Sequence, residues 1–127
     1  MRIIGHGIDM ENIASIKEEV DSPTKQWAER FCSAEERAQA DEPPVHYRYY
    51  AGRFAGKEAV VKALGTGFAG EITWRGVEIL RRESGAPYVR LCDEVKAFAE
   101  KLGINEWFIS ISYSDNTVVA SAIAVGD

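Results

Sequence analysis

Residues 51–67 read AGRFAGKEAVVKALGTG, and this stretch decides the fold. Together with the aromatic residues just before it, the stretch is rich in alanine and free of proline. It therefore predicts one long, largely buried helix from about Tyr47 to Leu64. Gly65 is the expected stop, because glycine readily takes the left-handed conformation that ends many helices. A buried helix of this length implies that the remaining elements pack around it.

The composition is that of an ordinary globular protein. The chain has 127 residues, of which 46% are hydrophobic and 28% charged, so we expect one domain spanning residues 1–127 with a core that needs no metal or disulfide. The net charge of −5 argues against a general nucleic-acid binder. Cys32 and Cys92 have neither disulfide-framework nor zinc-site spacing, and no stretch is typical of a signal peptide or membrane span. We therefore expect a cytoplasmic protein.

Shorter elements flank the long helix, and their order predicts the fold class. Turn signals and apolar periodicity indicate short strands and short helices. The mixed order favours a single α+β domain with an antiparallel sheet packed against the long central helix. The expected strands are Arg2–Asp9, Ile72–Trp74, Val77–Arg82, Tyr88–Leu91, Trp107–Ser114 and Thr117–Val125, and the expected short helices are Glu11–Val20, Thr24–Arg30, Ser33–Ala40 and Val95–Leu102.

Two acids stand where apolar residues would be expected. Asp9 ends an apolar strand, where it either projects into a site or caps the following helix. Glu58 shares a stripe of the long helix with Lys62, and such a pair on an exposed face would stabilise the helix by only a few tenths of a kcal/mol. Because the surrounding helix is mostly apolar, we expect the pair to face a cleft instead.

A metal site follows if Asp9 and Glu58 converge. Mg²⁺ typically takes one or two protein carboxylates and keeps positions for substrate phosphate oxygens. The pair would then predict phosphate chemistry.

Other polar features are weaker signals. Gly65-Thr66-Gly67 lacks the lysine of a P-loop and is explained as a helix cap and turn, although it could also approach a nucleotide. Alternation in the strand around Ser112 places three hydroxyls on one face. Neither His6 nor His46 has the context of a catalytic triad, so packing or surface roles are expected.

Three segments together resemble a known family. They are Gly5–Asp9, the central run Ala51–Gly67, and Ser110–Ser112; Trp74 and the Gly85-Ala86-Pro87 turn also match in order and spacing. The chain resembles the holo-(acyl-carrier-protein) synthases, the short-chain branch of the 4′-phosphopantetheinyl transferases.

The resemblance implies a Mg²⁺-dependent transferase of lipid metabolism, active in fatty acid biosynthesis. It would move phosphopantetheine from coenzyme A to a serine of an apo acyl carrier protein and release adenosine 3′,5′-bisphosphate, usually as a homotrimer with sites between subunits. By resemblance Asp9 and Glu58 are the metal ligands and Lys62 lies near the pyrophosphate. The positions implied at or near the coenzyme A site are Arg53, Gly65, Thr66, Ser112 and Tyr113, the last standing where the family commonly has histidine.

Two alternatives remain open from sequence. One is a non-catalytic module that binds coenzyme A or a carrier. The other is a transferase for a dedicated secondary-metabolism carrier, which is favoured by Ser15, because the family commonly has arginine at this position of the first helix.

Overall fold

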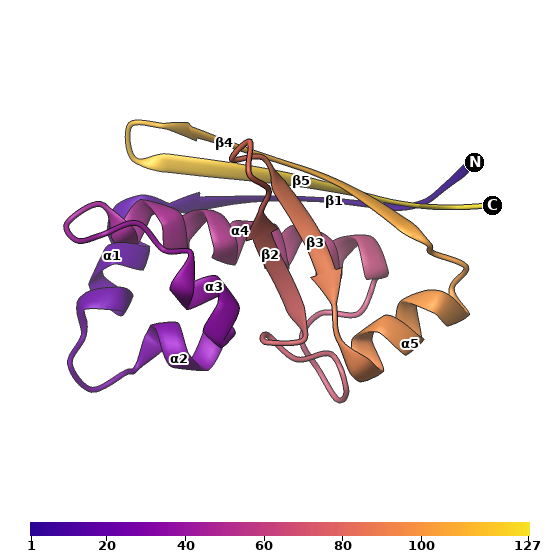
Figure 1. Ribbon diagram of the computed structural model, residues 1–127, viewed down its shortest axis with the longest axis horizontal. Coiled ribbons are helices and arrows are strands. Elements are labelled where there is room, and N and C mark those ends of the chain that lie inside the picture. The colour runs from indigo at the N-terminus through magenta and orange to yellow at the C-terminus, as the bar shows by residue number, and fades with distance from the viewer.

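The computed structural model describes residues 1–127 and shows an α+β domain in which a sheet and shorter elements surround one long helix (Figure 1). The predicted fold class is confirmed. None of the helices is long and apolar enough to cross a bilayer. In chain order the elements are β1 (Arg2–Asn12), α1 (Ile13–Asp21), α2 (Trp27–Phe31), α3 (Ala34–Ala38), α4 (His46–Leu64), β2 (Val77–Arg81), β3 (Pro87–Leu91), α5 (Asp93–Lys101), β4 (Glu106–Ser114) and β5 (Thr117–Gly126).

Helix α4 is the centre of the core. It ends at Gly65, whose φ of 80° lies in the left-handed region, as the sequence predicts. Its alanines at positions 51, 55 and 59 are fully buried, and they face alanines of β5 at positions 120, 122 and 124 that are equally buried. Small side chains on both surfaces let the helix and the sheet approach closely. The central helix is thereby held against the middle strand.

Three antiparallel strands form the main sheet in the order β1-β5-β4, and β2 pairs with β3 in a separate two-stranded sheet. Figure 1 shows α4 along one face of the main sheet, with no element of the chain over the other face. That uncovered face carries exposed apolar side chains on both edge strands. The most exposed are Met10, Ile3, Ile8 and Phe108, at 68%, 67%, 56% and 48%.

The expected strand Ile72–Trp74 is wrong. This segment forms turns: the Ile72 N–H donates to the Ala69 carbonyl and the Val77 N–H donates to the Trp74 carbonyl. The backbone groups are satisfied locally, and the Trp74 ring stacks on Phe68 at a centroid distance of 3.6 Å. The apolar character of the segment therefore reflects packing onto an aromatic cluster, not strand pairing.

The boundaries of the first helices also differ from expectation. Strand β1 continues past Asp9 to Asn12, because its pairing with β5 runs on to Thr117. Helix α1 begins at Ile13, and the Asn12 side chain caps it by accepting from the Ser15 N–H. Glu11 consequently belongs to the strand. By contrast, the capping box predicted between Ser33 and Glu36 is confirmed at the start of α3.

Candidate active site

Asp9 lies on the face of β1 that packs against α4. Gly5 and Gly7 precede it on the same face, and a Cβ at either position would overlap a backbone carbonyl of α4, that of Ala63 or Ala59. The glycines therefore let the strand lie directly on the helix, which brings Asp9 to the last turns of α4. Because Asn12 caps α1, a capping role for Asp9 is excluded.

Lys62 on α4 meets Asp9 across this contact. Its ammonium donates to the Ile8 carbonyl at 2.9 Å and to Asp9 Oδ1 at 3.2 Å. Lys62 thus pairs with Asp9, and the simple helical pair with Glu58 does not form. The second carboxylate oxygen of Asp9 is buried and has no hydrogen-bond partner. An orphaned anionic oxygen in the interior is unfavourable unless a cation or donor completes it, so this atom suits a metal ion.

Glu58 lies one helical turn before Lys62 on α4, and together with Asp9 it forms an acidic cluster. Burial, followed by the negative charge of Asp9, raises the pKa of Glu58, and the nearby Lys62 ammonium lowers it in part. Two carboxylates and one ammonium therefore share this place. Mg²⁺ is usually held by one or two protein carboxylates, so Asp9 and Glu58 would suffice as its protein ligands.

Glu11 is a member of the cluster that the sequence reasoning missed. Burial, together with the negative charges of Asp9 and Glu58, raises its pKa to about 8. The sequence predicts this residue as the start of the first helix, Glu11–Val20, not as part of the strand. The spacing of two residues between Asp9 and Glu11 could have indicated that they share a face, because alternate residues of a strand do so. That inference requires the strand to extend past Asp9.

Gly65 and Thr66 lie just beyond the Lys62 end of α4. Gly65 has no atom within 4 Å of the place of a Cβ, so its surface is open. The Thr66 N–H bonds the Val61 carbonyl, while its hydroxyl oxygen is buried without a partner. This is a second unsatisfied oxygen near the end of the helix that carries Lys62.

Arg53, Ser112 and Tyr113 do not join the acidic cluster within one chain. Arg53 is buried and donates to the Ile79 carbonyl at 2.9 Å. Tyr113 lies on β4, its hydroxyl occupying the space left by the missing side chain of Gly52. Ser112 is exposed and alternates with Tyr113 along β4, so it points to the uncovered face. Since β1 and β4 are opposite edges of the sheet, the predicted residues form two separate groups.

An aromatic cluster borders the acidic cluster, and the sequence reasoning did not find it. Phe54, one turn before Glu58, stacks on Trp74 at a centroid distance of 5.0 Å and contacts Phe31 and Trp27. A cavity of about 420 Å³ lies beside Phe54, lined also by Glu11. Through Glu11, the acidic cluster therefore borders a groove between α1, α2 and α4 that is lined by aromatic and by charged side chains. The spacing of four residues between Phe54 and Glu58 was the only sequence signal.

Comparisons with known proteins agree with this geometry. Residues 5–121 match the family model described as the 4′-phosphopantetheinyl transferase superfamily. The holo-[acyl-carrier-protein] synthase of Natranaerobius thermophilus is 38% identical over 98% of this chain and 99% of its own length, and that of Alkaliphilus metalliredigens is 41% identical over 96% and 98%.

Solved structures show the same fold. The holo-[acyl-carrier-protein] synthase of Neisseria meningitidis superposes with a TM-score of 0.86 at 31% identity, covering 97% of this chain and 98% of that one. The Helicobacter pylori synthase, solved in complex with coenzyme A, gives a TM-score of 0.83 at 28% identity, covering 94% and 99%. With matches of this extent, the chain belongs to the 4′-phosphopantetheinyl transferase superfamily, in its holo-(acyl-carrier-protein) synthase branch.

Proposed function

We propose that this enzyme transfers 4′-phosphopantetheine from coenzyme A to a serine hydroxyl of an apo acyl carrier protein and releases adenosine 3′,5′-bisphosphate. The observation that carries the proposal is the meeting of Asp9, Glu58 and Lys62 where β1 crosses the last turns of α4. Relatives named holo-[acyl-carrier-protein] synthase, one of them solved with coenzyme A, support the substrate pair.

Asp9 and Glu58 are the residues that would hold Mg²⁺. The fit rests on the orphaned Oδ2 of Asp9 and on the preference of Mg²⁺ for a few hard carboxylate oxygens. When bound, the ion would neutralise charge on the pyrophosphate during transfer. Lys62 adds a positive charge beside Asp9, so the anionic substrate would meet two cations there, the metal ion and the Lys62 ammonium.

Transfer requires one proton acceptor. The carrier serine oxygen would attack the phosphorus on the pantetheine side of the pyrophosphate, and the bond to the bisphosphate leaving group would break. The serine proton must leave as that new bond forms, and the Glu58 carboxylate is one group that could accept it. A water molecule is the other acceptor that the chemistry allows.

The enzyme would act as a homotrimer with its sites between subunits. The number of subunits comes from the family resemblance. Two features of the chain support shared sites: the outer face of the main sheet exposes several apolar side chains, and the Tyr113 group lies at the opposite edge strand from the Asp9 group. The Arg48 guanidinium carbon lies 4.6 Å from the centre of the Tyr113 ring. In an assembly, Arg48 of one copy could therefore contact the far end of a coenzyme A molecule that the next copy binds.

The carrier would meet the surface formed by α1 and α2. Two of the three cations there are already engaged, since Lys17 pairs with Asp21 and Lys25 with Glu19. Arg30 has no acidic partner and lies against the Phe31 ring. It is the cation best placed to contact an acidic carrier. Both cysteines are free, which suits the cytoplasmic location that we propose.

The test is a direct transfer assay. The purified chain is incubated with coenzyme A, Mg²⁺ and apo carrier proteins from fatty acid synthesis and from secondary metabolism, and intact mass is measured. We expect a phosphopantetheine adduct on the fatty-acid carrier. An adduct only on a secondary-metabolism carrier would show that the chain is a dedicated transferase. If no carrier gains an adduct, the alternative of a non-catalytic module that binds coenzyme A or a carrier is favoured.

A further inference from the structure

Lys57 and Glu36 form an ion pair in the interior that the proposed mechanism does not use. Both side chains are 0% exposed, and the ammonium lies 2.8 Å from the carboxylate. Removing two charges from water costs free energy that their attraction offsets only with further hydrogen bonds. The role of the pair therefore depends on what else its atoms hold.

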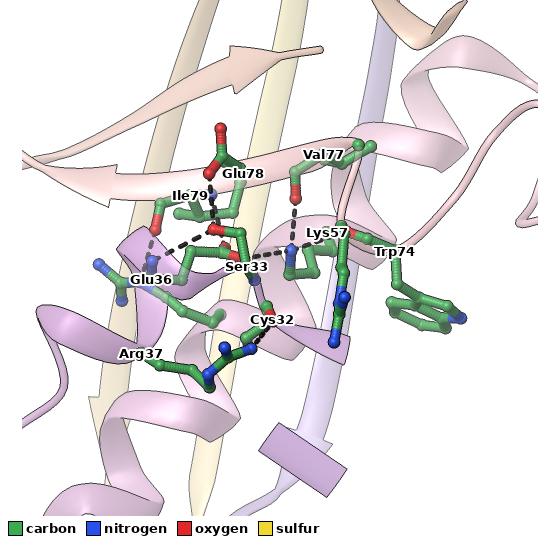
Figure 2. Close-up of polar contacts among 12 residues, drawn as sticks. Cys32, Ser33, Glu36, Arg37, Lys57, Trp74, Val77, Glu78 and Ile79 are labelled. Carbon is green, nitrogen blue, oxygen red and sulfur yellow. Dashed lines mark hydrogen bonds and ion pairs between the residues drawn. The ribbon is translucent and has the colours of Figure 1, made fainter. Parts of the chain in front are cut away.

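The Lys57 ammonium holds the backbone that leads from the loop after α4 into β2. Besides Glu36, it donates to the carbonyl oxygens of Trp74, at 2.8 Å, and Val77 (Figure 2). The second carboxylate oxygen of Glu36 accepts from the Ile79 N–H at 2.8 Å. All three N–H donors of the ammonium are thus satisfied, and α3, α4 and β2 are joined at one point.

This junction lies directly behind the candidate active site. Lys57 precedes Glu58 in α4, so the two side chains leave the helix about 100° apart. An ammonium fixed by three acceptors fixes the rotation of that helical turn, and with it the direction of Glu58. Trp74, whose carbonyl the ammonium holds, also stacks on Phe54, one turn before Glu58. One buried side chain therefore sets both the turn that carries Glu58 and the aromatic wall beside it.

We propose that Lys57 is a positioning residue for the transfer reaction, acting through Glu58 and Trp74. The inference rests on the proposed function. Lys57 is fully buried and touches no substrate, so its loss should displace the acceptor carboxylate without removing a binding contact. Small displacements of reacting groups lower turnover strongly. We therefore expect kcat to fall while the KM for coenzyme A changes little.

Two variants separate positioning from stability. Glu36→Gln keeps the Lys57 bonds to the carbonyls of Trp74 and Val77, whereas Lys57→Met removes them. Both should lower the melting temperature, because each leaves one charge of the pair without its partner. We expect Glu36→Gln to retain kcat within about threefold and Lys57→Met to lose roughly 10- to 100-fold. Each enzyme is assayed well below its own melting temperature.

The double variant Glu36→Gln/Lys57→Met removes both charges, so its melting temperature should rise above that of Lys57→Met. Its kcat should stay low, because methionine cannot donate to the two carbonyls. Arg90→Gln is the matched control: it removes an ion pair to the buried Glu78, 2.8 Å away, that does not involve α4, and it should lower stability while preserving kcat.

Two results would overturn the inference. One is recovery of wild-type kcat when the double variant regains stability, and the other is an equal loss of kcat in Glu36→Gln and Lys57→Met. If Lys57→Met does not fold, the double variant and Glu36→Gln still decide. Failure of the proposed function would look different, because the wild-type chain itself would then give no adduct.

Discussion

Asp9 uses its two carboxylate oxygens differently, and this difference leads to a prediction at the scale of single residues. Oδ1 accepts from Lys62, while the buried Oδ2 has no partner. Asp9→Asn and Glu58→Gln each replace a hard anionic ligand by an amide, which holds Mg²⁺ less well. Because a metal ion supplies several kcal/mol of charge stabilisation to phosphoryl transfer, we expect each variant to lose roughly 100-fold or more in kcat.

The measurement is the initial rate of adduct formation at limiting and at saturating Mg²⁺, with circular dichroism to show that the fold is intact. Excess chelator should abolish the activity of the wild type. Wild-type rates in both variants at limiting Mg²⁺ would show that these carboxylates do not hold the metal.

The sequence allowed part of this cluster to be predicted. Asp9 and Glu58 stood out because charged residues interrupted apolar elements, and the structure does bring Asp9 together with Lys62. Glu11 could not be assigned correctly, since its place depends on how far the pairing of β1 with β5 extends. Pairing length is a tertiary property, and a helical pattern from Glu11 onwards was locally just as consistent.

Among the elements, the contact between β1 and α4 is the one on which the site depends. A Cβ at Gly7 would overlap the Ala59 carbonyl, and backbone atoms cannot move aside as a side-chain tip can. We expect Gly7→Ala to lower the free energy of unfolding by about 2 kcal/mol or more. It should also reduce activity, because the strand must shift at Asp9. Chemical denaturation measures the first effect and the transfer assay the second.

Gly56→Ala is the matched control for this prediction. Its Cβ would meet only side-chain atoms, Ile79 Cγ1 at 3.1 Å and Ile109 Cδ1 at 3.3 Å, and such atoms can adjust by a few tenths of an ångström. Alanine is also the better helix former by up to about 1 kcal/mol. We expect a net change within about 1 kcal/mol. Equal stability of the two variants would show that β1 does not need a glycine to lie on α4.

The elements that the sequence predicted well are those with strong local signals, such as α4 with Gly65 at its end and the capping box of α3. The segment Ile72–Trp74 shows where local signals fail. Its apolar and β-branched residues suit a strand, but its environment is an aromatic cluster and the Lys57 ammonium. The Phe54 ring and the Lys57 ammonium are far from this segment in sequence, so its own apolar pattern did not indicate that it forms turns.

At the scale of the whole molecule, the two faces of the main sheet differ. Helix α4 covers one face of the main sheet (Figure 1), while Met10, Ile8 and Phe108 are exposed on the other. Several exposed apolar side chains on one face often mark an interface. Because Tyr113 and Asp9 belong to opposite edge strands, assembly through this face would let one copy complete the site of another.

Phe108→Glu tests the link between assembly and activity. Phe108 is 48% exposed in one chain and lies on β4, the edge strand opposite the one that carries Asp9. A carboxylate there would have to be buried without a partner on association, which is strongly unfavourable. We expect light scattering to give a trimer for the wild type and a monomer for the variant. With the sites between subunits, as proposed, turnover should then fall sharply. Leu102→Glu is the control, because Leu102 is similarly exposed, at 41%, but follows α5 and lies away from the sheet face. This variant should remain trimeric and active. A monomeric Phe108→Glu variant with full turnover would show that one chain holds coenzyme A by itself.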